Sequence, residues 1–385
     1  MEIVKKGYKK TEVGIIPEDW NVQAVSQFGE VKRGAGSQYI RYVNSNGIRL
    51  IRINDFFEDN PVFVSPTDEI MRYAINEQDV LFAGTGASAG ASYIPKNAWI
   101  GLPHSYNAPR IRVYKNQFKE YLLYSLQSEY VAKQQKAWFV GAAQPFLDTT
   151  AISNFKIATP PTKAEQTAIA AVLSDADALI TQLEKLIAKK RNIKQGAMQQ
   201  LLTGKKRLPG FNGMWEVKKL GEVLKVRHGK SQKEIVDENG EFPILATSGV
   251  VGRTRTFIYN KPSVLIGRKG TIDVPQYMDT PFWAIDTIFY TEIMDNAFPK
   301  FIFYKFNLID WYSHNEASGV PSLNAKSIEK IELLFPPTKE EQTLIAQILY
   351  DMDAEIEALE KKLEKYKMIK QGMMQNLLTG KIRLV

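Results

Sequence analysis

The sequence predicts an α+β protein, in which two globular domains of mixed α/β structure are separated by two long helices that form a coiled coil. Three observations lead to this pseudo-two-fold arrangement. A long segment occurs twice, each copy has the spacing and end signals of one helix, and the stretch before each copy contains short strand-like runs. The chain has 385 residues, of which 44% are hydrophobic, so it is large enough for two or three domains with proper cores.

The repeat covers residues 160–208 and 336–384, which align without a gap and are identical at 31 of 49 positions. A weaker echo opens each half, because Trp20 and Gly34 have the same spacing as Trp215 and Gly229. Each half is therefore predicted to be a globular domain followed by a long helix. The expected boundaries are residues 1–159 for the first domain, 160–208 for the central helix, 209–335 for the second domain and 336–385 for the C-terminal helix.

Each repeated segment carries helix signals at both ends. It opens with Pro-Pro, which cannot lie inside a helix, and continues with a T-x-x-E capping box. It closes with a glycine suited to the left-handed position after a helix. About 40 residues lie between these signals, which corresponds to roughly 60 Å of helix. The signal residues are Thr162, Glu165 and Gly204 in the first copy, and Thr338, Glu341 and Gly380 in the second.

The apolar residues inside each copy alternate at intervals of four and three, as in a coiled-coil seam, and the natural partner of each helix is the other. Lys194 and Lys370 interrupt the seam at equivalent positions. Gly196 and Gly372 each cost about 1 kcal/mol in a helix. They predict close backbone approach, within the pair or to another subunit, with a tolerated kink as the alternative. The expected seam residues are Ile169, Leu173, Ile180, Leu183, Ile187, Leu201, Ile345, Leu349, Ile356, Leu359, Leu363 and Leu377.

The globular parts contain short apolar runs typical of strands, together with two segments of helical pattern. We therefore expect each part to be a small mixed α+β domain. The expected strands are Ile48–Ile53, Asp79–Ala83, Pro109–Val113, Ser263–Gly267, Ile285–Tyr290 and Ile331–Phe335, and the expected helices are Glu120–Gln135 and Pro299–His314.

The distribution of charge and the absence of cysteine exclude several classes of functional site. The net charge of +8 is spread as +3 over residues 1–159, +5 over 160–208 and zero over the rest, so any nucleic-acid contact must come from local patches. The absence of cysteine excludes disulfides, thiolate metal sites and cysteine nucleophiles, and fits a reducing cytoplasm. The polar start, Met1 to Lys10, and the lack of any run of about 18 apolar residues predict a cytoplasmic protein without a membrane segment.

Three kinds of catalytic site were tested against the sequence. Pro-Pro at Pro160 and Pro336 lacks the preceding amide or acid and the following aromatic residue of an adenine methyltransferase loop. The stretch His228–Ser231 resembles the end of a phosphate-binding loop, but Leu224 stands where the first glycine is needed. The three histidines are widely scattered, which argues against a metal site. The expectation is a chain with no catalytic residues, no metal and no cofactor of its own.

Several loops have the composition of DNA contacts. The small residues of Gly84–Gly90 permit close approach of the backbone to a phosphate, amides can read adenine edges, and basic side chains can hold phosphates or guanine. For any one loop the alternative is a solvated turn. The candidate DNA-binding residues are Thr85, Ser88, Lys133, Gln134, Gln135 and Lys136 in the first half, and Arg227, His228, Lys230, Ser231, Arg253, Arg255, Arg268 and Lys269 in the second.

These features together resemble the specificity subunits of type I restriction–modification enzymes, over nearly the whole chain. The resemblance rests on the repeated P-P-T-K-x-E-Q-T blocks at Pro160–Thr167 and Pro336–Thr343 and on the Leu-Leu-Thr-Gly-Lys ends at Leu201–Lys205 and Leu377–Lys381. The openings Gly14–Trp20 and Leu208–Phe211, and the strand end Leu265–Thr271, are also similar. The first domain departs from the last motif, since Leu81–Gly86 has no basic pair.

The resemblance implies that each domain is a target-recognition domain that reads one half of a split, asymmetric site in double-stranded DNA. The helices would pair as an antiparallel coiled coil that sets the unread gap, and they would recruit two modification subunits, which bind S-adenosylmethionine and methylate adenine. Two restriction subunits would add translocation and cleavage driven by ATP with magnesium. Two alternatives stay open: an adaptor whose paired domains bind other proteins, and a stand-alone methyltransferase with an unrecognised donor site.

Overall fold

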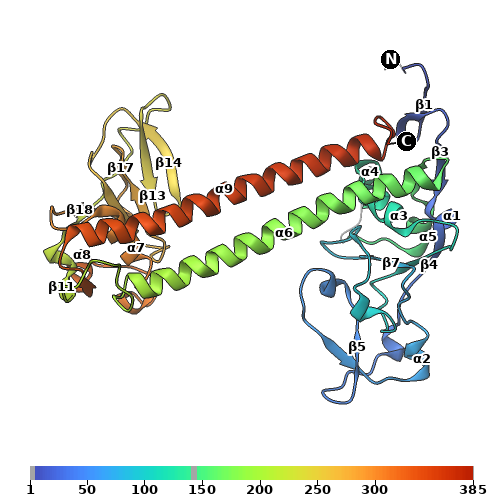
Figure 1. Ribbon diagram of the computed structural model, residues 1–385, viewed down its shortest axis with the longest axis horizontal. Coiled ribbons are helices and arrows are strands. Elements are labelled where there is room, and N and C mark those ends of the chain that lie inside the picture. The colour runs from blue at the N-terminus through green and yellow to red at the C-terminus, as the bar shows by residue number, and fades with distance from the viewer. Residues whose placement is uncertain (1–4, 140–144, 385) are drawn as a thin grey trace. The chain divides into compact units, whose positions relative to one another are not determined.

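The computed structural model describes residues 5–139 and 145–384 (Figure 1). Its contacts divide the chain into two compact units: Met1–Gln182 with Leu363–Val385, and Leu183–Lys362. Each unit therefore contains one globular domain together with one end of each long helix.

The first unit is built on a four-stranded antiparallel sheet with the order β4-β9-β7-β8, accompanied by three strand pairs. Helices cover the core, where Trp20, Phe28 and Phe155 are fully buried. The sheet strands are β4 (Gly29–Lys32), β9 (Arg110–Val113), β7 (Asp79–Phe82) and β8 (Ser92–Tyr93). The pairs are β1 (Tyr8–Thr11) with β2 (Gly14–Pro17), β3 (Asn21–Ala24) with β10 (Lys156–Thr159), and β5 (Ile48–Leu50) with β6 (Val62–Val64). The helices are α1 (Val25–Phe28), α2 (Asp68–Met71), α3 (Lys119–Leu126), α4 (Glu129–Phe139) and α5 (Thr149–Asn154).

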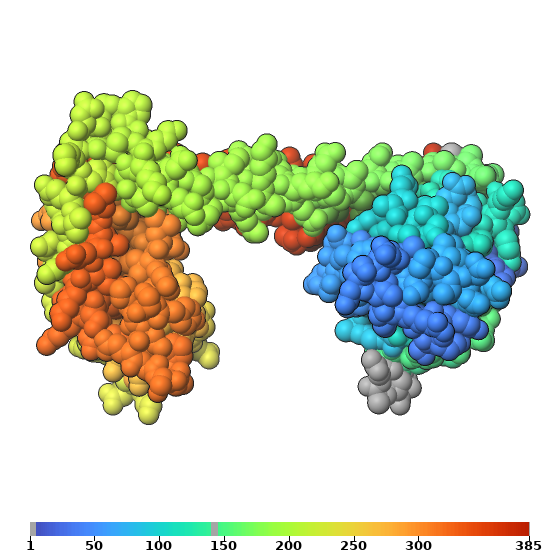
Figure 2. Space-filling model, turned by 90° about the horizontal axis from the view of Figure 1, so that it is seen from below, coloured from blue at the N-terminus to red at the C-terminus, as the bar shows by residue number. Residues whose placement is uncertain are grey.

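The second unit repeats the four-stranded sheet of the first and one of its strand pairs. Its four-stranded antiparallel sheet has the order β12-β18-β15-β16, in which each strand occupies the place of its counterpart in the first unit. In Figure 2 the orange segments of this domain lie against the yellow-green residues that follow the central helix. The strands are β12 (Leu224–His228), β18 (Ile288–Ile293), β15 (Ser263–Gly267), β16 (Gln276–Met278), β11 (Glu216–Lys219) with β19 (Glu332–Phe335), and β14 (Gly249–Thr254), β13 (Phe242–Ala246) and β17 (Trp283–Ala284). The helices are α7 (Pro299–Phe306) and α8 (Ala325–Lys330).

The two long helices are α6 (Lys163–Leu201) and α9 (Lys339–Leu377), each of 39 residues. Ion pairs within each unit show that they run antiparallel. Lys370 pairs with Asp177 at 2.5 Å in the first unit, and Lys190 pairs with Glu355 at 2.6 Å in the second. All twelve predicted seam residues are buried or half-buried. At its ends the seam enters the domain cores, because Leu173 packs in the first and Leu349 in the second.

The lysines that interrupt the seam are held by a repeated cluster of polar residues. The Lys370 ammonium donates to Asp177, whose second carboxylate oxygen accepts the hydroxyl of Tyr124 at 3.0 Å. The same lysine lies 5.5 Å from the centre of the Tyr124 ring. Each lysine therefore has a charge partner from the opposite helix and an aromatic partner from the domain. The equivalent residues in the second unit are Lys194, Asp353 and Tyr304.

The helix ends confirm some of the start and stop signals predicted from the sequence. Gly204 and Gly380 have φ of 71° and 67°, the left-handed conformation expected after each helix. Thr162 Oγ1 accepts the Glu165 N–H at 3.2 Å, as in a capping box. The second bond of each capping box, from the N-cap backbone N–H to the glutamate side chain, was predicted wrongly in both copies. The carboxylate of Glu165 accepts hydrogen bonds from Arg383, and its counterpart in the second unit is bound by Arg207.

Other expectations were wrong in detail. Added Cβ atoms at Gly196 and Gly372 would meet nothing within 4 Å, so the close approach expected within the helix pair is wrong, and an approach to another subunit stays a prediction. The strand expected at Ile48–Ile53 ends at Leu50, since the Asp55 carboxylate accepts the Arg52 N–H and starts a 3₁₀ turn.

Two expected helices and one strand also have different bounds. The helix expected at Glu120–Gln135 is two helices, because Ser128 bonds to Ser125 O and accepts the Val131 N–H. The helix expected at Pro299–His314 ends at Phe306, and a 3₁₀ turn follows at Trp311–His314. The strand expected at Ile285–Tyr290 begins only at Ile288, since Ile285 and Ile288 form a turn.

Candidate nucleic-acid interface

The two domains share a backbone junction at the glycines noted in the sequence. A Cβ on Gly34 would lie 2.2 Å from Ser105 O, and a Cβ on Gly229 would lie 1.9 Å from Ile285 O. Only glycine fits such a close approach of two backbones. The segment after β4 therefore crosses residues 104–106 in the first domain as the segment after β12 crosses residues 284–286 in the second.

The loops after β7 and β15 occupy equivalent places beside these junctions. Gly86 (φ 82°) donates its N–H to Pro145 O, and Gly270 (φ 86°) donates its N–H to Pro321 O. The preceding residues match as well, because Thr85 forms a bridge with Phe146 and Lys269 forms one with Ser322. The loop Gly84–Gly90 is thus the counterpart of the basic loop at Arg268–Gly270, although it carries no basic pair.

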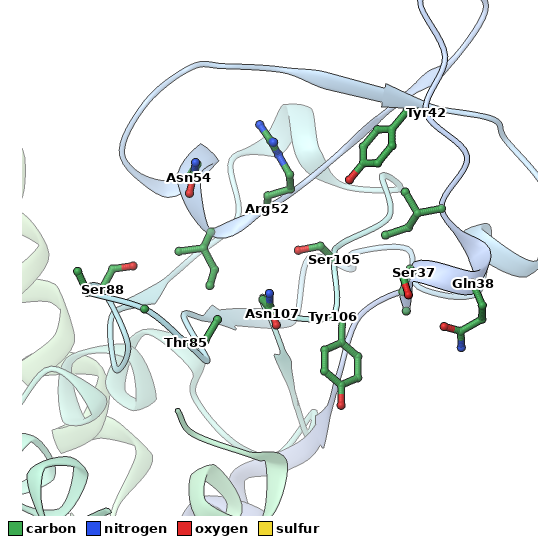
Figure 3. A pocket seen from close by; sticks show the side chains of 16 residues that line it. Ser37, Gln38, Tyr42, Arg52, Asn54, Thr85, Ser88, Ser105, Tyr106 and Asn107 are labelled. Carbon is green, nitrogen blue, oxygen red and sulfur yellow. The ribbon is translucent and has the colours of Figure 1, made fainter. Parts of the chain in front are cut away.

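In the first domain this loop borders a groove of about 820 Å³ (Figure 3). Two predicted residues, Thr85 and Ser88, line it. Figure 3 shows side chains along two walls: Asn54, Arg52 and Tyr42 on one side, and Ser88, Thr85, Asn107 and Tyr106 on the other. The lining is rich in amides and hydroxyl groups, which are the groups that read base edges. Sequence reasoning missed most of this lining, because its residues come from four separate segments of the chain.

The four predicted DNA-binding residues on α4 do not line this groove. Lys133 is paired with Glu129 at 2.9 Å, and Lys136 is exposed. The Gln134 amide bonds to the N–H and O of Lys156. Gln135 is 8% exposed and donates to Gly90 O at 3.2 Å. Both glutamines therefore use their amides within the protein, and Gln135 supports the Gly84–Gly90 loop; their contact with DNA stays a prediction.

All four predicted arginines in the second domain have partners within the protein, and Arg268 donates from Nη1 to Asp286 O at 3.3 Å. Arg227 pairs with Glu292 at 2.8 Å, and Arg255 pairs with Asp237 at 2.6 Å. Arg253 donates from Nε to Gly240 O at 2.7 Å and from Nη2 to Glu241 O at 2.8 Å. These bonds hold the edge strand β14 against the segment that precedes β13. Arg253 therefore stabilises the fold through these two hydrogen bonds, and its side chain is still accessible to solvent.

Arg268 and the other predicted residues of the second domain gather around residues 284–288. Lys230 donates its N–H to Ala284 O, and Arg268 donates its N–H to Thr287 O. The structure thus brings two basic loops together that are far apart in the sequence. His228 stands edge-on to Phe289 with the ring centres 4.9 Å apart. The exposed members are His228, Lys230, Ser231 and Lys269, while Arg268 is half-exposed.

Arg33 in the first domain was missed. It precedes Gly34 as His228 precedes Gly229, so the Val-x-x-Gly echo of the two strand ends could have identified it. Its guanidinium lies 4.3 Å from the centre of the Tyr106 ring.

The histidine that precedes Ser105 of the groove lining is enclosed by the protein. His104 is fully buried, and its Nδ1 lies 2.6 Å from Ala108 O. Burial lowers its pKa from 6.5 to about 4, so it is neutral near pH 7 and adds no charge to the groove. Among residues 5–139 and 145–384, no group of three histidine, aspartate or glutamate side chains could hold a metal ion. No helix in the same ranges is long and apolar enough to cross a membrane.

Comparisons with known proteins assign the architecture to a family. The family model for the type I restriction modification DNA specificity domain matches residues 17–195 and again residues 212–367. The chain is 28% identical over 424 residues to the putative type I restriction enzyme MjaX specificity subunit of Methanocaldococcus jannaschii, covering 99% of this chain and 97% of that protein. It is 27% identical over 418 residues to the MjaVIII specificity subunit of the same organism, covering 96% and 94%.

A solved structure supports the fold. The S subunit of a type I restriction-modification system from M. genitalium aligns with a TM-score of 0.65 at 16% identity, over 93% of this chain and 96% of that one. The predicted fold, two mixed α/β domains with two long helices, is confirmed by this likeness. Because the specificity-domain model matches each half, the chain belongs to the family of type I restriction–modification specificity subunits, whose role is DNA recognition and not catalysis.

Proposed function

We propose that each domain of this chain reads one half of a bipartite, asymmetric site in double-stranded DNA. The observation that carries this proposal is the shared loop frame with different side chains. Gly34 and Gly229 place the same backbone junction in both domains, whereas Thr85 stands where the second domain has Lys269. A common frame fixes the docking geometry, and different side chains give different base contacts.

The helices would hold the two domains at a set spacing and dock two modification subunits in the cytoplasm. Duplicated helices offer two equivalent surfaces, and each carries an exposed isoleucine at the same position: Ile193 is 46% and Ile369 43% exposed. Three residues further on, Gly196 and Gly372 leave open space. S-adenosylmethionine would bind to the modification subunits, and ATP with magnesium to two restriction subunits, since the candidate residues of this chain are suited to DNA contact alone.

The proposal is tested by binding selection from random DNA duplexes with the full chain in complex with its modification subunits. The enriched sequences should contain two short fixed blocks around a gap of fixed length, and adenine methylation should map to those blocks. Binding should weaken steeply with salt, because each neutralised phosphate adds about −0.9 to the slope of log K against log salt. A protein adaptor would show neither a motif nor a steep slope. Donor binding by the chain alone would instead indicate a methyltransferase.

A further inference from the structure

Arg33 is held by aromatic rings beside the groove of the first domain. Its guanidinium carbon lies 4.3 Å from the ring centre of Tyr106 and 4.9 Å from that of Phe146. The two rings are 45% and 46% exposed, and Arg33 itself is half-exposed. Tyr106 also lines the groove (Figure 3). The guanidinium is therefore oriented by stacking while remaining accessible.

The charge of Arg33 is unpaired among the described residues, unlike that of two other arginines of the first domain. Arg49 pairs with Asp55 at 2.6 Å, and Arg112 pairs with Asp79 at 2.8 Å. Those two cations are satisfied by carboxylates and serve the fold. Arg33 has its planar fork of five N–H donors available for an outside acceptor.

The internal repeat shows that this cluster occupies positions where the two domains differ. At backbone positions that are equivalent in the two domains, the side chains differ in size, charge and hydrogen-bonding character. Because the frame is common, these positions can carry the difference between the two half-sites. The pairs are Arg33 with His228, Tyr106 with Asp286, Asn107 with Thr287, and Phe146 with Ser322.

We propose that Arg33 is a base-reading, specificity-determining residue of the first domain and that it recognises a guanine in the major groove. Its fork would donate to O6 and N7 of one guanine, a pairing that the rigid guanidinium matches and a lysine does not. Tyr106 and Phe146 are positioning residues, because their rings fix the plane of the fork. This inference rests on the proposed DNA-reading function and adds one named contact to it.

The test is binding selection with the full chain in its complex, comparing wild type, Arg33→Ala and Arg33→Lys. Both variants should lose the preference for G at one position in one half-site, with affinity for the wild-type sequence reduced about 5- to 150-fold. The other half-site should be unchanged. Arg33→Lys keeps the charge, so its salt slope should stay at the wild-type value. Arg72→Lys, an exposed arginine of the same domain outside the groove lining, is the matched control and should leave both half-sites unchanged.

Each other outcome overturns the inference. If Arg33→Ala weakens all sequences equally and Arg33→Lys restores binding, Arg33 contacts a phosphate. If both variants keep the wild-type motif, Arg33 reads nothing while the proposed function stands. If the wild-type complex itself yields no two-part motif, the proposed function fails first. Should Arg33→Lys not fold, Phe146→Ala decides: loss of G preference at one position supports the inference, and an unchanged motif overturns it.

Discussion

Replacing Arg207 by leucine should release the end of α6 from the second domain. The carboxylate of Glu341 is fully buried and accepts hydrogen bonds from Arg207 Nε at 2.7 Å and Nη2 at 2.8 Å. Trp215 Nε1 is a weaker donor at 3.3 Å. Removing one partner of a buried ion pair leaves an uncompensated charge, which costs about 3–5 kcal/mol. That corresponds to a roughly 100- to 5,000-fold increase in local opening.

Hydrogen exchange of the full chain measures this effect locally, which matters because the two units need not unfold together. Amides of residues 202–208 should lose protection in Arg207→Leu. The double variant Arg207→Leu, Glu341→Leu should recover part of it, since no buried charge remains. Arg191→Leu is the control: its ion pair with Glu360 is shorter, at 2.5 Å, but its side chain is 64% exposed, so the loss should stay below about 1 kcal/mol.

The reasoning is refuted if Arg207→Leu and Arg191→Leu lower protection equally. It is also refuted if Arg207→Leu exchanges like wild type, because burial of Glu341 would then carry no penalty. The equivalent change in the first unit, Arg383→Leu, should affect only the residues that follow α9, since Arg383 binds Glu165 there.

Three further predictions concern the seam, the buried histidine and the helix length. Lys370→Asp should lower the melting temperature of the first unit by placing two carboxylates together, and adding Asp177→Lys should restore much of it. His104 should make stability pH-dependent: its folded pKa is about 4 against 6.5 unfolded, so below pH 6.5 the unfolded state gains the proton first. About 3 kcal/mol of the free energy of unfolding should be lost between pH 6.5 and 4, and urea titrations of His104→Gln should show a correspondingly shallower loss. Inserting seven residues after Leu183 and after Leu359 adds about 10 Å to each helix, and methylation mapped on a library of gaps should favour gaps about three base pairs longer; an active variant with the parental gap would show that the helices do not set it.

The long helices could be predicted nearly to the residue because their signals are local. Heptad spacing, Pro-Pro and the closing glycines all act within a few residues of the backbone that they determine. The seam lysines could be located but not explained. Tyr124, which completes the cluster around Lys370, comes from a domain helix far away in the sequence. The predicted role of the capping-box glutamates was wrong for the same reason, because an arginine that is distant in the sequence binds each carboxylate.

The candidate site was predictable only in part. Thr85 and Ser88, which line the groove, were predicted because a run of small residues marks a loop, and Lys269 was predicted because it is basic and follows a strand. The sequence did not show that the Gln134 amide bonds to the backbone of Lys156. Arg33 was not predicted, because the rings of Tyr106 and Phe146 lie far from it in the sequence and only the fold brings them beside it. Sequence composition identifies side chains able to bind DNA, but only tertiary contacts show which of them remain free to do so.

Exchange of one domain tests the central claim most directly. Residues 1–159 are replaced by the corresponding domain of a relative with a known site, and adenine methylation is mapped on DNA exposed to the assembled complex. The account predicts that one half-site changes to that of the relative while the other half-site is retained. Simultaneous change of both half-sites, or no change in either, would contradict the claim that each domain reads its own half of the site.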